Sequence, residues 1–241
     1  MTVFLVLPAF NEEGNLALVL DACARAIESV GRQLRVVLVD DGSTDGTAMI
    51  AKAWASRLPM ELIVHEENRG LGTTIRDGLK RAAELAGPAD AIVTMDADNT
   101  QPASLIPRML EAMEAGNDLV IASRFRPGAQ VVGLGAFRRG LTIVSSFLYR
   151  AILPIPGVRD YTCGFRIYRG SLLQRAFATY KERFVTETGF ACMAEILVKL
   201  RPLAPVVHEV PMILRYDFKK GASKMPVAGT VRRSLNLLLR S

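Results

Sequence analysis

The sequence predicts an α/β fold built on a doubly wound, mostly parallel sheet flanked by helices. Apolar segments of strand character alternate with helical segments through the first half of the chain, an order that produces parallel strands joined by crossover helices. Half of the 241 residues are hydrophobic, as strands buried on both faces require. A chain of this length can bury a full core as one domain or as two closely packed halves.

Apolar segments and turn residues place the elements of the first half in order. The expected strands cover residues 3–7, 34–39, 61–65 and 91–95. Helices are expected where apolar residues recur at helical spacing or follow a glycine-containing turn, at residues 16–27, 47–57 and 73–86. Each strand therefore ends where a loop leads into the next helix.

Carboxylates follow three of these four strands. Glu12 comes after the first strand, Asp40 and Asp41 end the second, and Asp96 and Asp98 follow the fourth. The carboxyl ends of parallel strands meet at one edge of the sheet, where open α/β sheets bind their ligands. An Asp-rich turn would explain a single cluster. Three clusters on one edge indicate a ligand site.

Asp96 and Asp98 are the candidate metal ligands. They are two residues apart at the end of an apolar strand, so both would project from the same side if the strand geometry persists. Carboxylate oxygens suit Mg²⁺ or Mn²⁺, which keep waters and share the phosphates of a substrate. The glycine-rich dinucleotide and phosphate-loop motifs are both missing. We therefore expect a divalent ion that bridges the protein to a nucleotide diphosphate.

In the second half of the chain, predicted strands and helices alternate less regularly. A fifth strand, a later helix and a further strand are expected at residues 118–122, 188–199 and 206–214. A basic loop and a short amphipathic helix follow at residues 216–224 and 231–239. The carboxyl-terminal part is therefore expected to extend the sheet and then to leave it.

The helix expected at residues 141–152 has Arg138 and Arg139 near its start and an apolar face. This composition is typical of a helix at a membrane surface, and a core helix with solvated ends explains it equally well. The longest apolar region, 140–156, contains Arg150 and falls short of the ~20 predominantly apolar residues of a spanning helix. We expect no bilayer crossing and no secretory leader, while contact with a membrane surface stays open.

The chain is basic, with a formal net charge of +6, and most of the excess lies beyond residue 120. Such a surface attracts the phosphates of a nucleotide, a lipid head group or a nucleic acid. Nucleic acid is disfavoured, because the basic residues adjoin an apolar helix and no nucleic-acid motif is present. The three cysteines show no pairing or metal-binding spacing, so a reduced, cytoplasmic setting is expected.

Seven short motifs, taken together, resemble those of the family 2 glycosyltransferases of the GT-A fold, and within them the dolichol-phosphate mannose synthase group. The motifs lie in order along nearly the whole chain, at residues 7–13, 39–47, 68–72, 95–98, 122–125, 163–166 and 221–225. The resemblance implies a Rossmann-like sheet with an extension of helices and strands on the acceptor side. Residues 1–125 would form the nucleotide-sugar-binding half and residues 126–241 the acceptor-binding half of a single catalytic domain.

The resemblance also implies roles for residues of the donor side. The nucleotide base and ribose would be lined by Pro8, Phe10, Glu12 and Asp41, with Asp40 supporting them. Asp96 and Asp98 would hold Mg²⁺ or Mn²⁺ on the donor diphosphate, Asp98 at the catalytic centre. Family members often have glutamine where this chain has Thr100, which leaves the third protein ligand open between Gln101 and water.

On the acceptor side, Arg124 and Arg138 match arginines that contact the phosphate of the acceptor in the family. Guanidinium groups suit phosphate oxygens in shape and charge. Asp160 resembles an acidic position beside the transfer site. Lys220 and Lys224 lie in a loop that would close over the diphosphate, and a solvated loop is the alternative.

The function that the resemblance implies is inverting transfer of a sugar, with mannose from GDP-mannose as the first expectation, onto a polyprenyl or dolichyl phosphate. A phosphate monoester loses its second proton near pH ~6, so it needs no strong general base, which fits an arginine-rich half. The alternatives are a UDP-sugar enzyme with a hydroxyl acceptor, for which Asp160 would remove the proton, and a sensor without turnover. A nucleotidyltransferase is disfavoured, because the first strand leads into an acidic loop.

The expected partners are the nucleotide-sugar donor, the polyprenyl phosphate, a membrane surface and a membrane partner protein. The optional carboxyl-terminal membrane spans of the family are not expected in this chain. The expected location is therefore cytoplasmic and peripheral, at the cytoplasmic face of the membrane.

Overall fold

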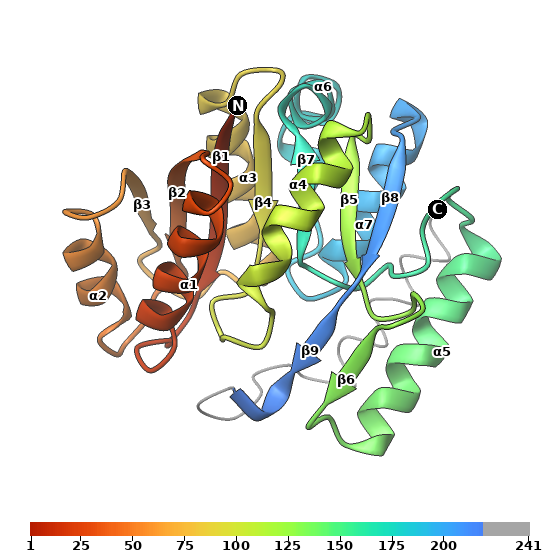
Figure 1. The fold of residues 1–241 in the computed structure, drawn as a ribbon, viewed down its shortest axis with the longest axis horizontal. Coiled ribbons are helices and arrows are strands. Elements are labelled where there is room, and N and C mark those ends of the chain that lie inside the picture. Colours follow the sequence, from red (N-terminus) through yellow and green to blue (C-terminus); the bar gives the residue numbers. More distant parts are fainter. Residues whose placement is uncertain (219–241) are drawn as a thin grey trace.

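A seven-stranded sheet runs through the centre of the molecule (Figure 1). The computed structural model describes residues 1–218, apart from the side chains of residues 136–139, 141 and 145. The strands of this sheet are β1 (Thr2–Ala9), β2 (Gln33–Asp40), β3 (Met60–Val64), β4 (Ala91–Thr94), β5 (Leu119–Ser123), β7 (Arg166–Arg169) and β8 (Val207–Pro211). Their order is β3-β2-β1-β4-β7-β5-β8, and only β7 runs antiparallel to its neighbours. The predicted mostly parallel sheet is confirmed.

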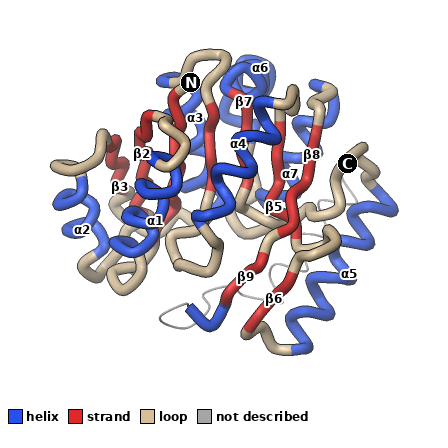
Figure 2. Tube along the Cα trace, in the orientation of Figure 1, coloured by secondary structure: helices blue, strands red, loops and turns tan. Residues whose placement is uncertain are grey.

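Helices cover both faces of the sheet (Figures 1 and 2). They are α1 (Leu16–Glu28), α2 (Thr47–Trp54), α3 (Leu71–Leu85), α4 (Ile106–Glu114), α5 (Ala136–Ile152), α6 (Gly170–Tyr180) and α7 (Cys192–Leu200). α1 contacts α2 and α4 on one face, and α3 contacts α6 and α7 on the other. α5 lies beside β6, away from the main sheet (Figure 1).

The first strands form as the apolar pattern predicts. The central residues of β1 and β2 are almost fully buried, Leu5 and Val37 among them, because helices lie on both sides of these strands. α3 packs closely against them, since a side chain added at Gly78 would come within 2.6 Å of Val6 Cγ1. The glycine therefore lets the helix approach the sheet.

The strand order reverses at β1 and β4, which predicts a ligand crevice there. From β1 the chain runs through β2 and β3 to one side, and then crosses to β4 on the other side of β1. Open α/β sheets bind ligands outside the carboxyl ends of the strands at such a reversal. The acidic residues after β1, β2 and β4 lie at this edge.

Two parts of the second half differ from the sequence prediction. β7 is a short antiparallel strand between β4 and β5 that the apolar pattern did not indicate. The expected strand at residues 206–214 is wrong in its extent, because it is two strands. After β8 the chain continues as β9 (Ile213–Arg215), which pairs with β6 (Gln130–Val132) in a separate two-stranded sheet.

Met212 is the point at which the chain changes sheets. Its N–H donates to the carbonyl of Ser123 at 3.0 Å, and its carbonyl accepts from the N–H of Gln130 at 3.1 Å. Its side chain is almost fully buried, so the apolar alternation of the sequence continues through the break. Alternation alone therefore could not show that the two ends pair with different strands.

Within residues 1–218, no helix has both the length and the apolar character that a membrane span requires.

Candidate active site

The acidic residues singled out from the sequence lie along one edge of the sheet. Asp40 is the last residue of β2, and the N–H of Asp41 donates to the carbonyl of Ala9 at the end of β1, at 2.8 Å. Glu12 follows β1, and the Asp96–Asp98 turn follows β4. The structure therefore brings the three acidic clusters to the β1 and β4 crevice.

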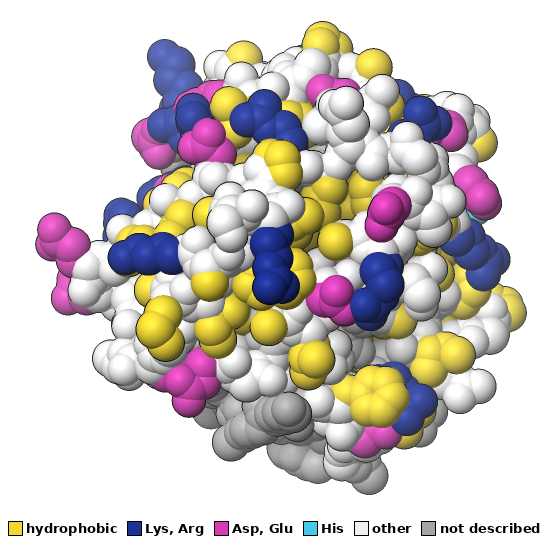
Figure 3. Space-filling model, turned by 60° about the vertical axis from the view of Figure 1, so that its left-hand side comes forward, with side chains coloured by type: hydrophobic (Ala, Val, Ile, Leu, Met, Phe, Trp, Pro, Cys, Tyr) yellow, Lys and Arg dark blue, Asp and Glu magenta, His cyan; other side chains and the backbone are white. Residues whose placement is uncertain are grey.

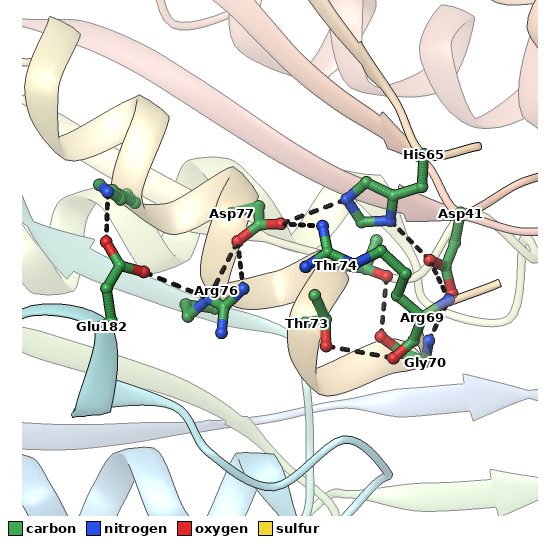
Figure 4. A network of polar contacts seen from close by, with 10 residues as sticks. Asp41, His65, Arg69, Gly70, Thr73, Thr74, Arg76, Asp77 and Glu182 are labelled. Atoms are coloured by element: carbon green, nitrogen blue, oxygen red, sulfur yellow. Dashed lines mark hydrogen bonds and ion pairs between the residues drawn. The ribbon is translucent and has the colours of Figure 1, made fainter. Parts of the chain in front are cut away.

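Asp41 holds the loop that leads into α3 (Figure 4). It is buried, one oxygen accepts from the N–H of Arg69, and the other accepts from the N–H of Gly70, both at 2.9 Å. His65 Nδ1 lies 2.7 Å from the first oxygen. Both carboxylate oxygens thus bind protein groups that shape this loop.

His65 links Asp41 to α3. Its other ring nitrogen lies 3.2 Å from Asp77 Oδ2, and Asp77 also accepts from Arg76 Nε at 2.9 Å (Figure 4). His65 was not among the site residues predicted from the sequence. The structure shows a buried polar bridge between two carboxylates. The available signal was its position directly after β3, at the same edge as the aspartates.

The other donor-side residues surround the end of β1. Pro8 is buried within β1, beyond the last residue that pairs with β4, where its missing N–H costs no hydrogen bond on that side. Phe10 is half-buried in the turn that follows. Glu12 is buried and accepts from the side-chain amide of Asn15 at 2.8 Å, while Asp40 accepts from the N–H of Ser43 at 3.1 Å. The side chains of Glu12 and Asp40 are therefore held by protein groups at this edge of the sheet.

Asp96 and Asp98 lie in a turn beyond β4, which ends at Thr94. The condition of persisting strand geometry is not met, because the strand ends before Asp96 and the chain turns at residues 97–98. The two carboxylates are instead held by the side chains of Thr100 and Gln101. Asp96 Oδ2 accepts from Gln101 Nε2 at 2.7 Å, and Asp98 Oδ1 accepts from Thr100 Oγ1 at 2.7 Å.

The turn could bind a divalent ion through the carboxylates of Asp96 and Asp98. Both carboxylates are only half-buried and supply hard oxygen atoms. No third aspartate, glutamate, histidine or cysteine of residues 1–218 joins them in a group that could hold an ion. Mg²⁺ and Mn²⁺ commonly complete their shells with waters and substrate phosphates. Gln101 and Thr100 orient the two carboxylates in this arrangement.

Arg124 and Asp160 form a buried ion pair at the end of β5. Arg124 Nε donates to Asp160 Oδ2 at 2.8 Å, and its Nη2 donates to Asp160 Oδ1 and to Thr162 Oγ1, both at 2.6 Å. The side chain of Asp160 is fully buried and that of Arg124 is 12% exposed. Such a two-pronged contact fixes the plane of the guanidinium.

The charges of this pair support each other. Burial alone would raise the pKa of Asp160, but the charge and the hydrogen bonds of Arg124 outweigh burial and lower it. Burial alone would lower the pKa of Arg124, and Asp160 reverses that effect and raises it. Both groups are therefore charged at neutral pH, and a low pKa makes Asp160 a poor proton acceptor.

Glu209 of β8 places Asp160. Its buried carboxylate accepts from the N–H groups of Arg159 and Asp160, at 2.6 and 2.8 Å. Arg126 Nε lies 3.1 Å from the other carboxylate oxygen, as an ion pair without hydrogen-bond geometry. The sequence analysis did not select Glu209, since a glutamate within an alternating strand reads as a solvated position.

Glu195 of α7 anchors a second loop at the edge of the sheet. Its buried carboxylate accepts from the N–H groups of Thr186 and Glu187, each at 2.9 Å, and from Lys199 Nζ at 2.7 Å. Residues 186–191 form a loop, and α7 begins at Cys192. The start of this helix, expected near residue 188, is therefore wrong by four residues.

The Glu195-anchored loop packs on the loop that Asp41 holds. The N–H of Gly72 donates to the carbonyl of Thr188 at 2.9 Å. A side chain at Gly72 would come within 1.6 Å of the carbonyl oxygen of Glu187, and one at Gly70, whose φ is +88°, within 2.5 Å of that of Thr188. Both glycines are therefore required by close backbone approach.

Three of the expected site residues are not placed. Arg138 lies in α5, and its side chain is outside the described part of the molecule. Lys220 and Lys224, together with the expected amphipathic helix at residues 231–239, lie outside the described residues. Their expected roles stay predictions.

A hollow of about 460 Å³ lies behind the Asp96–Asp98 turn, between α1 and residues 99–107. Arg215 and Phe218 border it, with the guanidinium 4.2 Å from the centre of the ring. On the face that Figure 3 shows, apolar side chains gather between scattered basic and acidic ones. The turn is thus open on the side away from the crevice.

Comparison with known proteins identifies relatives of this chain. Residues 4–177 match the family described as Glycosyl transferase family 2. A dolichol-phosphate mannosyltransferase of Pyrococcus furiosus is 29% identical over 83% of this chain and 53% of its own length. An undecaprenyl-phosphate mannosyltransferase of Micrococcus luteus is 30% identical over 93% of this chain and 88% of its own length. The chain thus spans about half of the first relative and most of the second.

A solved structure shares the fold. Glucosyl-3-phosphoglycerate synthase of Mycobacterium tuberculosis, crystallised with Mn²⁺, UDP and phosphoglyceric acid, superposes with a TM-score of 0.69 at 18% identity, covering 99% of this chain and 78% of that one. This likeness shows the GT-A architecture expected from the motifs.

The contact between the two anchored loops can be tested at Gly72. Gly72→Ala should lower the free energy of unfolding by about 1–3 kcal/mol, because the added methyl group meets the backbone of Glu187. Urea unfolding measures this change. Gly140→Ala in α5 is the control, since nothing lies within 4 Å of its added methyl group, and alanine should stabilise a helix by about 0.5–1 kcal/mol. Equal stability of Gly72→Ala and the native chain would contradict this contact.

Proposed function

Because the chain belongs to glycosyl transferase family 2, we propose that it transfers a sugar from a nucleotide-sugar donor to a polyprenyl phosphate, with inversion at the anomeric carbon. The two relatives described above are named for mannosyl transfer to dolichol phosphate and undecaprenyl phosphate. Mannose from GDP-mannose is accordingly the first donor to test. The identities of the nucleotide base and of the transferred sugar are part of this proposal.

One observation carries the proposal: a fixed cation lies on the same edge as the acidic turn, two strands away. β4 and β5 both pair with β7, and neighbouring strands are about 4.8 Å apart. Their carboxyl ends, which lead to Asp96 and Arg124, are therefore separated by about 10 Å. A diphosphate at the acidic turn and a phosphate at Arg124 would leave room for one sugar between them.

The surroundings of Arg124 suit a phosphate that carries an apolar chain. A pocket of about 140 Å³ lies beside it, lined mainly by apolar residues of the β6 region and α5, among them Phe125, Val131, Leu134 and Ile143. Guanidinium binds phosphate oxygens well, and the apolar wall would bury the first part of an isoprenoid chain. The pocket thus supports a lipid phosphate over a free sugar hydroxyl.

On the donor side, each group has a role that its contacts support. Asp96 and Asp98 would hold Mg²⁺ or Mn²⁺, which when bound supplies positive charge to the leaving diphosphate. Gln101 and Thr100 keep the two carboxylates in position. The base and ribose would be lined by Pro8, Phe10, Glu12 and Asp41, with Asp40 supporting them. The contacts of Asp40 and Asp41 with backbone N–H groups would also fix the surrounding loops.

On the acceptor side, the reaction needs positioning more than proton transfer. A phosphate monoester is largely a dianion above pH ~6, so its oxygen can attack the anomeric carbon while the bond to the diphosphate breaks. Arg124 would hold and orient that phosphate. Asp160 is fully buried and already paired, so its geometry supports a role in positioning Arg124 rather than that of a general base for a hydroxyl acceptor.

α5 is the proposed contact with the membrane. Its apolar side chains Ile143, Val144, Phe147 and Ile152 are 50–67% exposed, and the spacing of the first three places them on one helical face. Tyr149 of the same helix and Leu153 directly after it are buried. A half-exposed apolar face next to the Arg124 pocket would bring that pocket to the lipid surface. The proposed location is therefore peripheral, at the cytoplasmic face, and a membrane partner protein stays a proposal.

The proposed function is tested by release of nucleoside diphosphate. The chain is incubated with each of a panel of GDP- and UDP-sugars, with Mg²⁺ or Mn²⁺, in the presence and absence of a polyprenyl phosphate, with the matching polyprenol as control. Release that requires the lipid phosphate and one donor supports the proposal. Release that is unaffected by lipid phosphate, or equal with polyprenol, would refute it.

The metal role is tested with Asp98→Asn. Asparagine can still accept the hydrogen bond from the N–H of Thr100, but it is a weaker ligand for Mg²⁺ or Mn²⁺. We expect metal-dependent release to fall at least about a hundredfold, with little change in thermal stability. Asp21→Asn on the exposed face of α1 is the control. Full activity in Asp98→Asn would rule out this assignment.

The membrane role of α5 is tested with Phe147→Glu. Replacing a phenylalanine that would be buried in the lipid surface should weaken sedimentation with anionic phospholipid vesicles about tenfold or more. Leu18→Glu, at a 47% exposed apolar residue of α1, should sediment like the native chain. Unchanged sedimentation of Phe147→Glu, or an equal loss in both variants, would argue against α5 as the contact.

A further inference from the structure

Tyr216 interacts electrostatically with both the acidic turn and Arg124, and it has no role in the site described so far. It begins a short 3-10 helix, η4 (Tyr216–Phe218), directly after β9. The backbone just before it is tied to the acidic turn, because the N–H of Arg215 donates to the carbonyl of Thr100 at 2.9 Å. Thr100 also holds Asp98. The position of Tyr216 is therefore coupled to that of the turn.

The opposite side of Tyr216 is fixed by the β6 loop. Gly133 has a φ of +78°, and a side chain there would come within 3.4 Å of Tyr216 Cβ and 2.9 Å of the N–H nitrogen of Asp217. β6 and β9 pair up to Val132 and Arg215, so Gly133 and Tyr216 continue that pairing side by side. This close approach limits how far the tyrosine can move.

The charges around Tyr216 come from both halves of the site. Burial raises its pKa, the charge of Arg124 lowers it, and the charges of Asp96 and Asp98 raise it further. Tyr216 thus interacts electrostatically with groups on both sides of the site. An ordinary phenol has a pKa near 10, so the hydroxyl group carries its proton at neutral pH.

The hydroxyl group of Tyr216 has no hydrogen-bond partner in the described part of the chain, although the side chain is half-buried. Half-buried phenols usually find a partner. A neutral phenol in this position can donate to an anionic oxygen, and a phosphate held by Arg124 would supply one.

We propose that Tyr216 is a substrate-binding residue that donates a hydrogen bond to the acceptor phosphate held by Arg124. The hydrogen bond would fix the phosphate on the side that faces the acidic turn. It would also offset the repulsion between the acceptor phosphate and the donor diphosphate as they approach. This assignment rests on the proposed function, because it requires a phosphate monoester as the acceptor.

The assignment is tested with Tyr216→Phe, which removes only the hydroxyl group. Binding of a short isoprenyl phosphate, citronellyl phosphate, is measured by calorimetry on the full chain saturated with nucleoside diphosphate and Mn²⁺. We expect the dissociation constant of the phosphate to rise about tenfold to a hundredfold. The affinity for nucleoside diphosphate and the thermal unfolding midpoint should match those of the native chain.

Tyr180→Phe is the matched control. Tyr180 is also half-buried, at the end of α6, and its ring stacks on Phe184, so the same hydroxyl group is removed away from the site. It should bind citronellyl phosphate like the native chain. In the transfer reaction, Tyr216→Phe should raise the KM for the lipid phosphate far more than it lowers kcat, which a merely structural role would not do.

The outcomes separate this inference from the proposed function. Equal binding of citronellyl phosphate by the native chain and Tyr216→Phe would overturn the role of Tyr216 and leave the proposed function standing. A loss of nucleotide affinity without a change for the phosphate would also overturn it. If the native chain binds citronellyl phosphate no better than citronellol, the phosphate acceptor and the role of Tyr216 are both refuted.

Discussion

The buried ion pair of Asp160 and Arg124 is the interaction on which the acceptor side of this molecule depends. The side chain of Asp160 is fully buried. The backbone N–H of Asp160 donates to the carboxylate of Glu209, which holds Asp160 in place. Breaking one partner of such a pair typically costs about 3–5 kcal/mol, since the other charge is left buried and unpaired. The guanidinium is therefore presented at the edge of the sheet in one orientation, before any ligand arrives.

Buried carboxylates play the same part elsewhere on this edge. Asp41 fixes the loop before α3, and Glu195 fixes the loop before α7, in each case by accepting from backbone N–H groups. The two loops then meet at glycines that allow backbone contact. Preorganised loops of this kind lower the entropy that binding would otherwise cost. Some of the carboxylates at this edge of the sheet thus hold the loops of the site in place.

Much of the fold could be predicted from the sequence, because buried parallel strands produce long apolar segments and their loops carry the functional residues. The acidic edge and the motifs around Asp96 and Arg124 were found for that reason. β7 is four residues long and antiparallel, too short for a periodic signal. The break at Met212 was hidden, because a buried residue preserved the alternation. The partners of Asp160 and His65 could not be predicted, since these contacts join segments that only the folded chain brings together.

The central claim is that the two charged positions on this edge hold a leaving diphosphate and an accepting phosphate. Mass spectrometry of the lipid fraction after reaction with the active donor tests it most directly. The account predicts a lipid that keeps its phosphate and gains the mass of one sugar residue. Recovery of the sugar only as free sugar, or on a lipid alcohol offered in the same mixture, would contradict it.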